Sequence, residues 1–324
     1  MSNQGLLHNP PKCEYPTEFL VARLQGKKSR LFQDWEKLLS RTDLQGFLLD
    51  TPFYPYLAEY GNGAMWRYLA DEYQWVYVRM NPSLRKLFAP YFIFRQSESL
   101  LVSLRFLHKK GSLDEVGQQM GSSLLNNDLR AALTSGRDFS GVIEEVETQL
   151  CIISKDFNGL SDQYAENGFH VLETFLKERL ITYITSLQMD RLLSSFVQRL
   201  VDHRNCLILA KALRWKQKIA PRFLPGGTQA IELFEKAFSK NDMHPILKRF
   251  HVAYLPDAIS SLSVLETALL NNITKTLKKW SRFRSATAYI LFYLWEQFRY
   301  TRNISMILHT VMVDDDLIFE HIII

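Results

Sequence analysis

The chain has 324 residues, 47% of them hydrophobic and 23% charged, a composition typical of folded globular proteins and not of disordered ones. Its formal net charge of +5 is too mild for the dense basic surface of a dedicated nucleic-acid-binding protein. The length predicts two or three units, each able to bury a core of its own.

The cysteines and the apolar segments give expectations about the environment of the chain. Cys13, Cys151 and Cys206 are far apart and form neither a CxxC metal pair nor an even disulfide framework, which favours a reducing cytosol. The first residues lack the apolar core of a signal peptide. The most apolar tract, 286–295, has about half of the roughly twenty residues needed to span a bilayer. We therefore expect no membrane crossing.

The first part of the chain is expected to form short helices. Residues 15–25 and 29–39 have helical patterns, and Gly26 is expected to separate them. Thr42–Gln45 has the form of a capping box, in which the hydroxyl and the later amide each bind a free backbone N–H group. A helix over 65–78 is expected next, before Pro82 begins a new segment.

The middle of the chain predicts longer helices. We expect one over 92–108, and Ser112–Glu115 has the form of a second capping box that opens the next helix. Residues 139–153 have apolar side chains at a helical interval. The polar stretch 157–168 is expected to be a loop. Two long helices are expected after it, over 169–187 and 190–216.

The last part contains two breaks and two further long helices. Pro221, Pro225, Gly226 and Gly227 interrupt the chain, and Thr228 is expected to cap a helix over 229–238. A second break is expected around Pro245 and Pro256, followed by helices over 258–279 and 285–312. Because no run of alternating Val, Ile and Thr is bounded by turns, the predicted fold class is all-α.

Three long amphipathic stretches, 95–110, 200–216 and 299–312, have similar sequences and begin about a hundred residues apart. Ser99, Asn205 and Asn303 occupy equivalent positions if these stretches are copies. A repeat of this length is too long for a thin solenoid, whose units have roughly 20–50 residues. The spacing predicts three similar helical modules, over 1–113, 114–224 and 225–324.

Few residues indicate chemistry. The string Gly26–Ser29 lacks the earlier glycine of a phosphate-binding loop, and the histidines lack a metal-binding spacing. His203 beside Asp202 could act as a base, although a charged pair on a long helix is most often a solvated edge, and we favour that explanation. We expect no catalytic residue, no cofactor and no metal site.

Two polar features remain as candidate sites. Asn205 shares a stripe with apolar residues at the edge of an expected helix interface, so its amide either contacts a partner protein or binds a neighbouring helix and fixes its register. The second feature is a positive stripe with Trp280 inside it, either a solvated helix face or a docking face for an acidic partner protein or lipid headgroups. The stripe consists of Lys275, Lys278, Lys279 and Arg282.

Several segments together resemble one family. Asp202–Asn205 is followed by a hydrophobic run and by Lys211, Arg222–Gly227 contains an apolar-Pro-Gly-Gly step, and Arg302–Ile304 lies in the final helix. Tyr15–Leu31 is similar to the Tyr, Ala-Arg and Ser-Arg-Leu start of the same pattern. In this order they resemble the C-type stalk subunits of archaeal-type and bacterial V-type rotary ATPases, whose eukaryotic relative is the d-type subunit in the V-ATPase membrane sector. The family signature residues here are Asp202, Asn205, Pro225, Gly226, Gly227 and Asn303.

The resemblance implies a mechanical role. The family forms a funnel-shaped, pseudo-threefold body at the membrane end of the central stalk, where it links the stalk to the membrane rotor ring and transmits torque for H⁺ or Na⁺ transport. The implied partners are the other stalk proteins and the ring, with no nucleic acid and no small-molecule substrate, and the implied location is peripheral, on the cytoplasmic face of the membrane. The coupled ion, the direction of ATP turnover and the lobe that contacts the ring stay open.

Three departures and two alternatives accompany this interpretation. Gln96, Ser99 and Ser305 replace the acidic residue, the asparagine and the arginine of the family pattern.

One alternative function is a helical scaffold or adaptor unrelated to rotary ATPases. The other is an enzyme with a site assembled from scattered residues around Asp202, His203 and Glu173.

Overall fold

Helices form the regular structure wherever the chain is described. The computed structural model describes residues 5–32, 35, 38, 44–252, 261–309 and 321–323. Within these ranges there is no strand, and the only β-type pairing is an isolated antiparallel bridge between Leu7 and Leu125. The predicted all-α class is confirmed.

Close packing divides the chain into two compact units, each built from two sequence segments. Unit 1 comprises residues 1–14 and 74–197, and unit 2 comprises residues 15–73 and 198–324. Helices α5 (Ala64–Arg79) and α11 (Arg191–Arg214) each contribute residues to both units. The units describe packing, whereas the three predicted modules describe internal likeness, so the modules and their funnel arrangement stay predictions.

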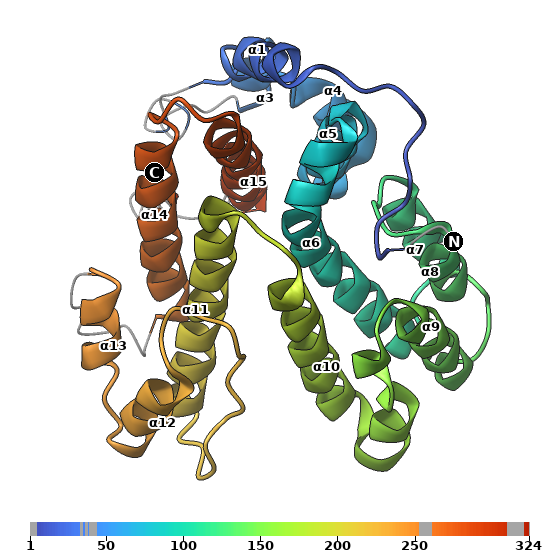
Figure 1. The fold of residues 1–324 in the computed structure, drawn as a ribbon, viewed down its shortest axis with the longest axis vertical. Coiled ribbons are helices and arrows are strands. Elements are labelled where there is room, and N and C mark those ends of the chain that lie inside the picture. Colours follow the sequence, from blue (N-terminus) through green and yellow to red (C-terminus); the bar gives the residue numbers. More distant parts are fainter. Residues whose placement is uncertain are drawn as a thin grey trace. The chain divides into compact units, whose positions relative to one another are not determined.

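Unit 1 is a group of helices around the long α6 and α10. Its elements are α6 (Pro82–His108), α7 (Leu113–Gly121), α8 (Asn127–Leu133), α9 (Phe139–Ile153), η2 (Lys155–Phe157) and α10 (Leu160–Ser186). Helices α6 and α9 pack against α10, and α8 packs against α9 (Figure 1). The second capping box opens α7 at the expected place, but the Ser112 side chain makes no capping hydrogen bond.

Helix α6 begins well before the expected position near Phe92. The Asn81 side chain accepts a hydrogen bond from Leu84 N (2.9 Å) and caps the helix, and Pro82 occupies its first turn. Pro90 lies inside the helix, where a proline removes one backbone hydrogen bond. The helix continues through it because Phe88 and Phe92 on either side are fully buried, and their burial offsets that loss.

The predicted loop over 157–168 is wrong, because most of this stretch is the first half of α10. The Glu147 carboxylate of α9 accepts hydrogen bonds from Gly159 N (2.5 Å), Ser161 N (2.8 Å) and Ser161 Oγ (2.5 Å), so it satisfies the free amides at the start of the helix. Leu160 is buried. Gly168 has φ +77° and ψ −178°, which joins two helical segments across a kink that a residue with a Cβ atom would resist.

Unit 2 combines helices from both ends of the chain. Its elements besides parts of α5 and α11 are α1 (Thr17–Lys28), α3 (Leu44–Leu48), α4 (Tyr54–Tyr60), η1 (Gly61–Gly63), α12 (Ile231–Ser239), α13 (His244–Arg249), α14 (Leu262–Trp280) and α15 (Ala286–His309). Helix α14 packs along α15, and α1 also packs against α15 (Figure 1). Thr42 of the first expected capping box, residues 258–260 and residues 310–312 lie outside the described residues.

Helix α1 does not end before Gly26, as the sequence had predicted, but continues to Lys28. A glycine inside a helix costs about 1 kcal/mol relative to alanine. Leu20 and Leu24 are fully buried, and Lys27 Nζ lies 2.5 Å from Glu72 Oε2, so tertiary contacts offset that cost.

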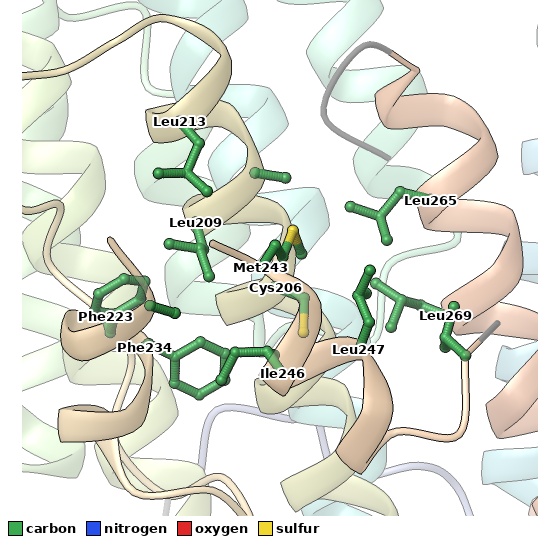
Figure 2. Packing of buried hydrophobic residues seen from close by; sticks show 13 residues of the cluster. Cys206, Leu209, Leu213, Phe223, Phe234, Met243, Ile246, Leu247, Leu265 and Leu269 are labelled. Atoms are coloured by element: carbon green, nitrogen blue, oxygen red, sulfur yellow. The ribbon is translucent and has the colours of Figure 1, made fainter. Parts of the chain in front are cut away.

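Two hydrophobic clusters contribute to the core of unit 2 among its described residues. In the first, side chains of α11, α12, α13 and α14 meet around Cys206, Leu209, Phe234 and Leu247 (Figure 2). In the second, Tyr300 of α15 packs against aromatic residues from the first part of the chain, including a stacked contact with Phe53. The N-terminal segment and the last helix therefore share one core.

Candidate functional site

The Asn205 amide fastens α11 to the chain segment that follows it. Asn205 is fully buried. Its Nδ2 donates to Leu224 O (2.9 Å), and its Oδ1 accepts from Leu224 N (2.8 Å), so both ends of the amide bind the same residue. The sequence left a partner protein and a neighbouring helix open as contacts, and the structure shows a loop within the chain instead.

Asp202, one turn earlier on α11, binds the next part of that loop. Its carboxylate accepts hydrogen bonds from Thr228 N (3.0 Å), Thr228 Oγ1 and Gln229 N (3.2 Å). Burial raises the pKa of Asp202, and the hydrogen bonds from Thr228 and Gln229 partly offset the rise. A Cβ atom at Gly227 would collide with Asp202 Oδ1, which explains why glycine is needed there.

The Pro-Gly-Gly step adapts the loop to this attachment. Gly226 has φ +84°, a conformation that favours glycine, and Pro225 before it is half-buried. Thr228 does not cap α12, contrary to expectation, since its hydroxyl binds Asp202 and the helix begins at Ile231 without a side-chain cap. The four signature residues Asp202, Asn205, Gly226 and Gly227 thus cooperate in one loop attachment.

Asn303 on α15 makes the same kind of attachment near the C-terminus. Its Nδ2 donates to Ile323 O (3.0 Å), and its Oδ1 accepts from Ile323 N (3.1 Å). Arg299 Nη1 also donates to Ile323 O (3.2 Å) and Arg302 Nη1 to His321 O (3.1 Å). Sequence reasoning gave no role to the two arginines, although their spacing around Asn303 on one helix was visible.

In the first long helix the corresponding contact comes from Gln96 and not from Ser99. Gln96 is buried, and its Oε1 accepts from Leu124 N (3.1 Å) and Ser123 Oγ (2.6 Å) in the segment between α7 and α8. Ser99 is only half-buried. Gln96 lies three residues before Ser99, and its side chain is long enough for the amide oxygen to reach the segment at Ser123 and Leu124. Helices α6, α11 and α15 thus each bind a later segment of the chain through a buried side-chain amide.

The predicted docking stripe lies at the end of α14. Lys275, Lys278, Lys279 and Arg282 are all exposed. The spacing of the three lysines places them on one side of the last helical turns, and Arg282 follows just after the helix ends at Trp280. Trp280 is half-buried, and Phe283 beside the stripe is 56% exposed. Cations at a helix C-terminus are favoured by the helix dipole, so a purely structural origin and a docking role are both compatible with this geometry.

Lys28 at the end of α1 lies near the same stripe. Its Nζ is 3.8 Å from Glu296 Oε2 and 4.0 Å from the centroid of the Phe292 ring. Burial lowers the pKa of Lys28, Glu296 opposes the lowering, and Arg299 and Lys278 add to it. Of the stripe residues, Lys278 is thus close enough to act on the charge of Lys28.

The other candidate residues have internal roles. Gly26–Ser29 forms the end of α1, whereas phosphate-binding loops use the start of a helix, where N–H groups are free. Glu173 binds Arg105 and Lys177. Burial tends to raise the pKa of Glu173, but the hydrogen bonds from these two residues outweigh it and lower the pKa to about 2.

Metal-binding clusters and membrane-spanning helices are both absent from the described part of the chain. It contains no group of three or more His, Cys, Asp or Glu side chains placed to hold a metal ion. None of the helices described combines the length and the apolar character required to span a bilayer.

Comparison with known proteins identifies the family. The family model of the ATP synthase (C/AC39) subunit matches residues 20–316. The chain belongs to this family. The matched range includes the three amides Gln96, Asn205 and Asn303, and the resemblance drawn from the sequence is confirmed. A search of curated proteins gave no match.

Family membership decides between some of the functional alternatives. The family comprises structural components of V/A-type ATP synthases, so the chain is expected to associate with other proteins of such an assembly. This is consistent with a non-catalytic role in the stalk. A scaffold unrelated to rotary ATPases does not agree with a family match over nearly the whole chain.

Proposed function

We propose that the chain is the non-catalytic central-stalk spacer of a rotary V/A-type ATPase. It links the stalk to the membrane rotor ring on the cytoplasmic face and transmits the torque that drives H⁺ or Na⁺ transport. The observation that carries the proposal is the family match over residues 20–316. ATP hydrolysis takes place in other subunits, and this chain contributes shape and stiffness.

The internal packing supports a torque-transmitting role. Close-packed helices have low compressibility and pass strain on to their neighbours. The buried amides of Gln96, Asn205 and Asn303 bind the segments that follow their helices, so these segments move with the helices instead of independently. A spacer with such attached segments loses less rotation to internal deformation than one with free loops.

The exposed stripe of Lys275, Lys278, Lys279 and Arg282 is proposed as a docking face for an acidic protein of the assembly. Its four charges lie together on an exposed helix end, and Phe283 adds exposed apolar surface beside them. Charge complementarity would set the orientation and rate of assembly, with apolar contacts adding affinity.

The test is affinity purification of the tagged chain from gently solubilised membranes, followed by identification of the proteins that accompany it. Proteins of the stalk and the ring are expected, whereas a clean monomer would contradict the assignment. Replacing all four stripe residues by Glu is expected to remove one group of partners. Lys236→Glu with Lys240→Glu, two exposed changes at the end of α12, is the control and should leave all partners bound.

If the stripe variant retains every partner, the docking proposal is wrong while the assignment to the ATPase still stands.

A further inference from the structure

A second basic surface of unit 2 lies where α11 ends, separate from the stripe at the end of α14. We define it as the basic tip: Lys211, Arg214, Trp215, Lys216, Lys218 and Ile219. All six side chains are exposed, and Trp215 is 64% and Ile219 83% exposed. No acidic residue occurs between Asp202 and Glu232 in the sequence. The tip belongs to the end of α11 and the segment between α11 and α12 in Figure 1.

The backbone holds the tip away from the core. Just after α11, Lys216 has φ +50°, and Lys216 N and Gln217 N donate to Leu213 O and Ala212 O (both 3.0 Å), which ends the helix sharply. Beyond the tip, Phe223 is buried in the cluster of Figure 2, and Leu224 is bound by Asn205. The backbone is thus fixed on both sides of residues 218–222, and Trp215 and Ile219 are exposed in this arrangement.

The composition of the tip matches an anionic lipid surface. A tryptophan and an aliphatic residue among basic residues is the pattern of segments that lie at a membrane interface, where the ring enters the headgroup region and the charges stay in water. Three of the four cations are lysines, whose flexible point charges suit a diffuse layer of headgroups better than the fixed geometry of a protein carboxylate. The neighbouring α12 has Glu232 and Glu235 beside Lys236, so the positive excess belongs to the tip.

We propose that the basic tip binds the surface of an anionic lipid bilayer, with Trp215 and Ile219 inserted among the headgroups. This contact is separate from the stripe on α14 and does not depend on the proposed torque role. It would hold one end of unit 2 at the membrane through lipid as well as through any protein partner.

The test is sedimentation of the purified full-length chain with vesicles. Binding is expected to vesicles of equal parts phosphatidylcholine and phosphatidylglycerol, and not to vesicles of phosphatidylcholine alone. Salt should weaken it, and each lysine replaced by Gln should weaken it about fivefold. Trp215→Ser with Ile219→Ser should abolish it, while Ile152→Ser, at a residue 61% exposed in unit 1, should not change it.

A second measurement locates the contact. Brominated lipid should quench tryptophan emission in the parent chain, and the quenching should be lost in Trp215→Phe. Because these side chains are exposed, circular dichroism should show all variants folded. Three results would each overturn the proposal. No binding to the anionic vesicles would leave a protein partner as the ligand of the tip. Binding unchanged by the double serine variant would place the lipid contact elsewhere on the chain, and binding lost only when the α14 stripe is neutralised would place it on the stripe.

Discussion

Removing the Asn205 amide would test the attachment between α11 and the following loop. Asn205→Leu keeps a side chain of similar size but removes both hydrogen-bonding groups. Leu224 is 5% exposed, so its N–H and C=O groups would lose partners in a buried position. Each unsatisfied buried group costs about 1–3 kcal/mol, and the two together should lower the free energy of unfolding by about 2–6 kcal/mol. That is a large share of the roughly 5–15 kcal/mol by which domains are stable.

The assay combines urea unfolding with amide hydrogen exchange of the stretch 217–230. We expect a lower urea midpoint and faster exchange around Leu224, with the exchange of unit 1 unchanged. Asn158→Leu is the matched control, because Asn158 is exposed and its replacement should change stability by less than about 0.5 kcal/mol. An unchanged midpoint with Leu224 still protected in Asn205→Leu would refute the reasoning.

Three further changes should have measurable effects. Gly227→Ala should lower the free energy of unfolding by about 1–3 kcal/mol, because the added Cβ atom would meet the hydrogen-bonded Asp202 carboxylate. Gly117→Ala is the control, since a Cβ atom there has no close neighbour, and it should not lower the free energy of unfolding. Equal losses for the two variants in urea unfolding would argue against the proposed collision. Lys110→Gly should raise the free energy of unfolding by about 0.5–1 kcal/mol, since Lys110 has φ +58°, and a lower urea midpoint would count against it. The folded-state pKa of Glu173 is lowered to about 2, so its contribution to the free energy of unfolding is present above its unfolded pKa and is lost as pH falls toward 2. The free energy of unfolding, measured across this pH range, should therefore fall less steeply in Glu173→Gln than in the parent chain. Parallel curves would contradict the pairing of Glu173 with Arg105 and Lys177.

The sequence predicts the fold class because the helical signals are local. Periodic apolar residues placed the helix over 139–153, which matches α9 at both ends. Asp190 at the start of α11 is a similarly local signal, since its side chain caps the helix by accepting from Leu193 N (2.8 Å). Such features need only residues within one or two turns.

The errors come from contacts that join distant residues. The start of α10 was missed because its cap, Glu147, belongs to the preceding helix α9. Thr228 was expected to cap α12, but the Asp202 carboxylate from α11 binds its hydroxyl. Helix α1 was ended too early at Gly26 because the burial of its apolar face could not be read from the local pattern.

The candidate site shows the same division. The spacing of Asn205 and Asn303 pointed to equivalent positions, and the structure gives both the same two hydrogen bonds to a later residue. In the first helix, comparison of the three similar stretches selected Ser99, whereas the amide that makes the contact is Gln96. A longer side chain reaches from a different helical position, and only the three-dimensional path of the following segment reveals that substitution.

The measurement closest to the central claim is ATP-driven ion uptake by membrane vesicles from cells with and without the chain. If the chain is the torque-transmitting spacer, its removal should abolish uptake while ATP hydrolysis by the remaining catalytic subunits continues, and adding the chain back should restore uptake. Unchanged ion uptake in vesicles that lack the chain would contradict the account.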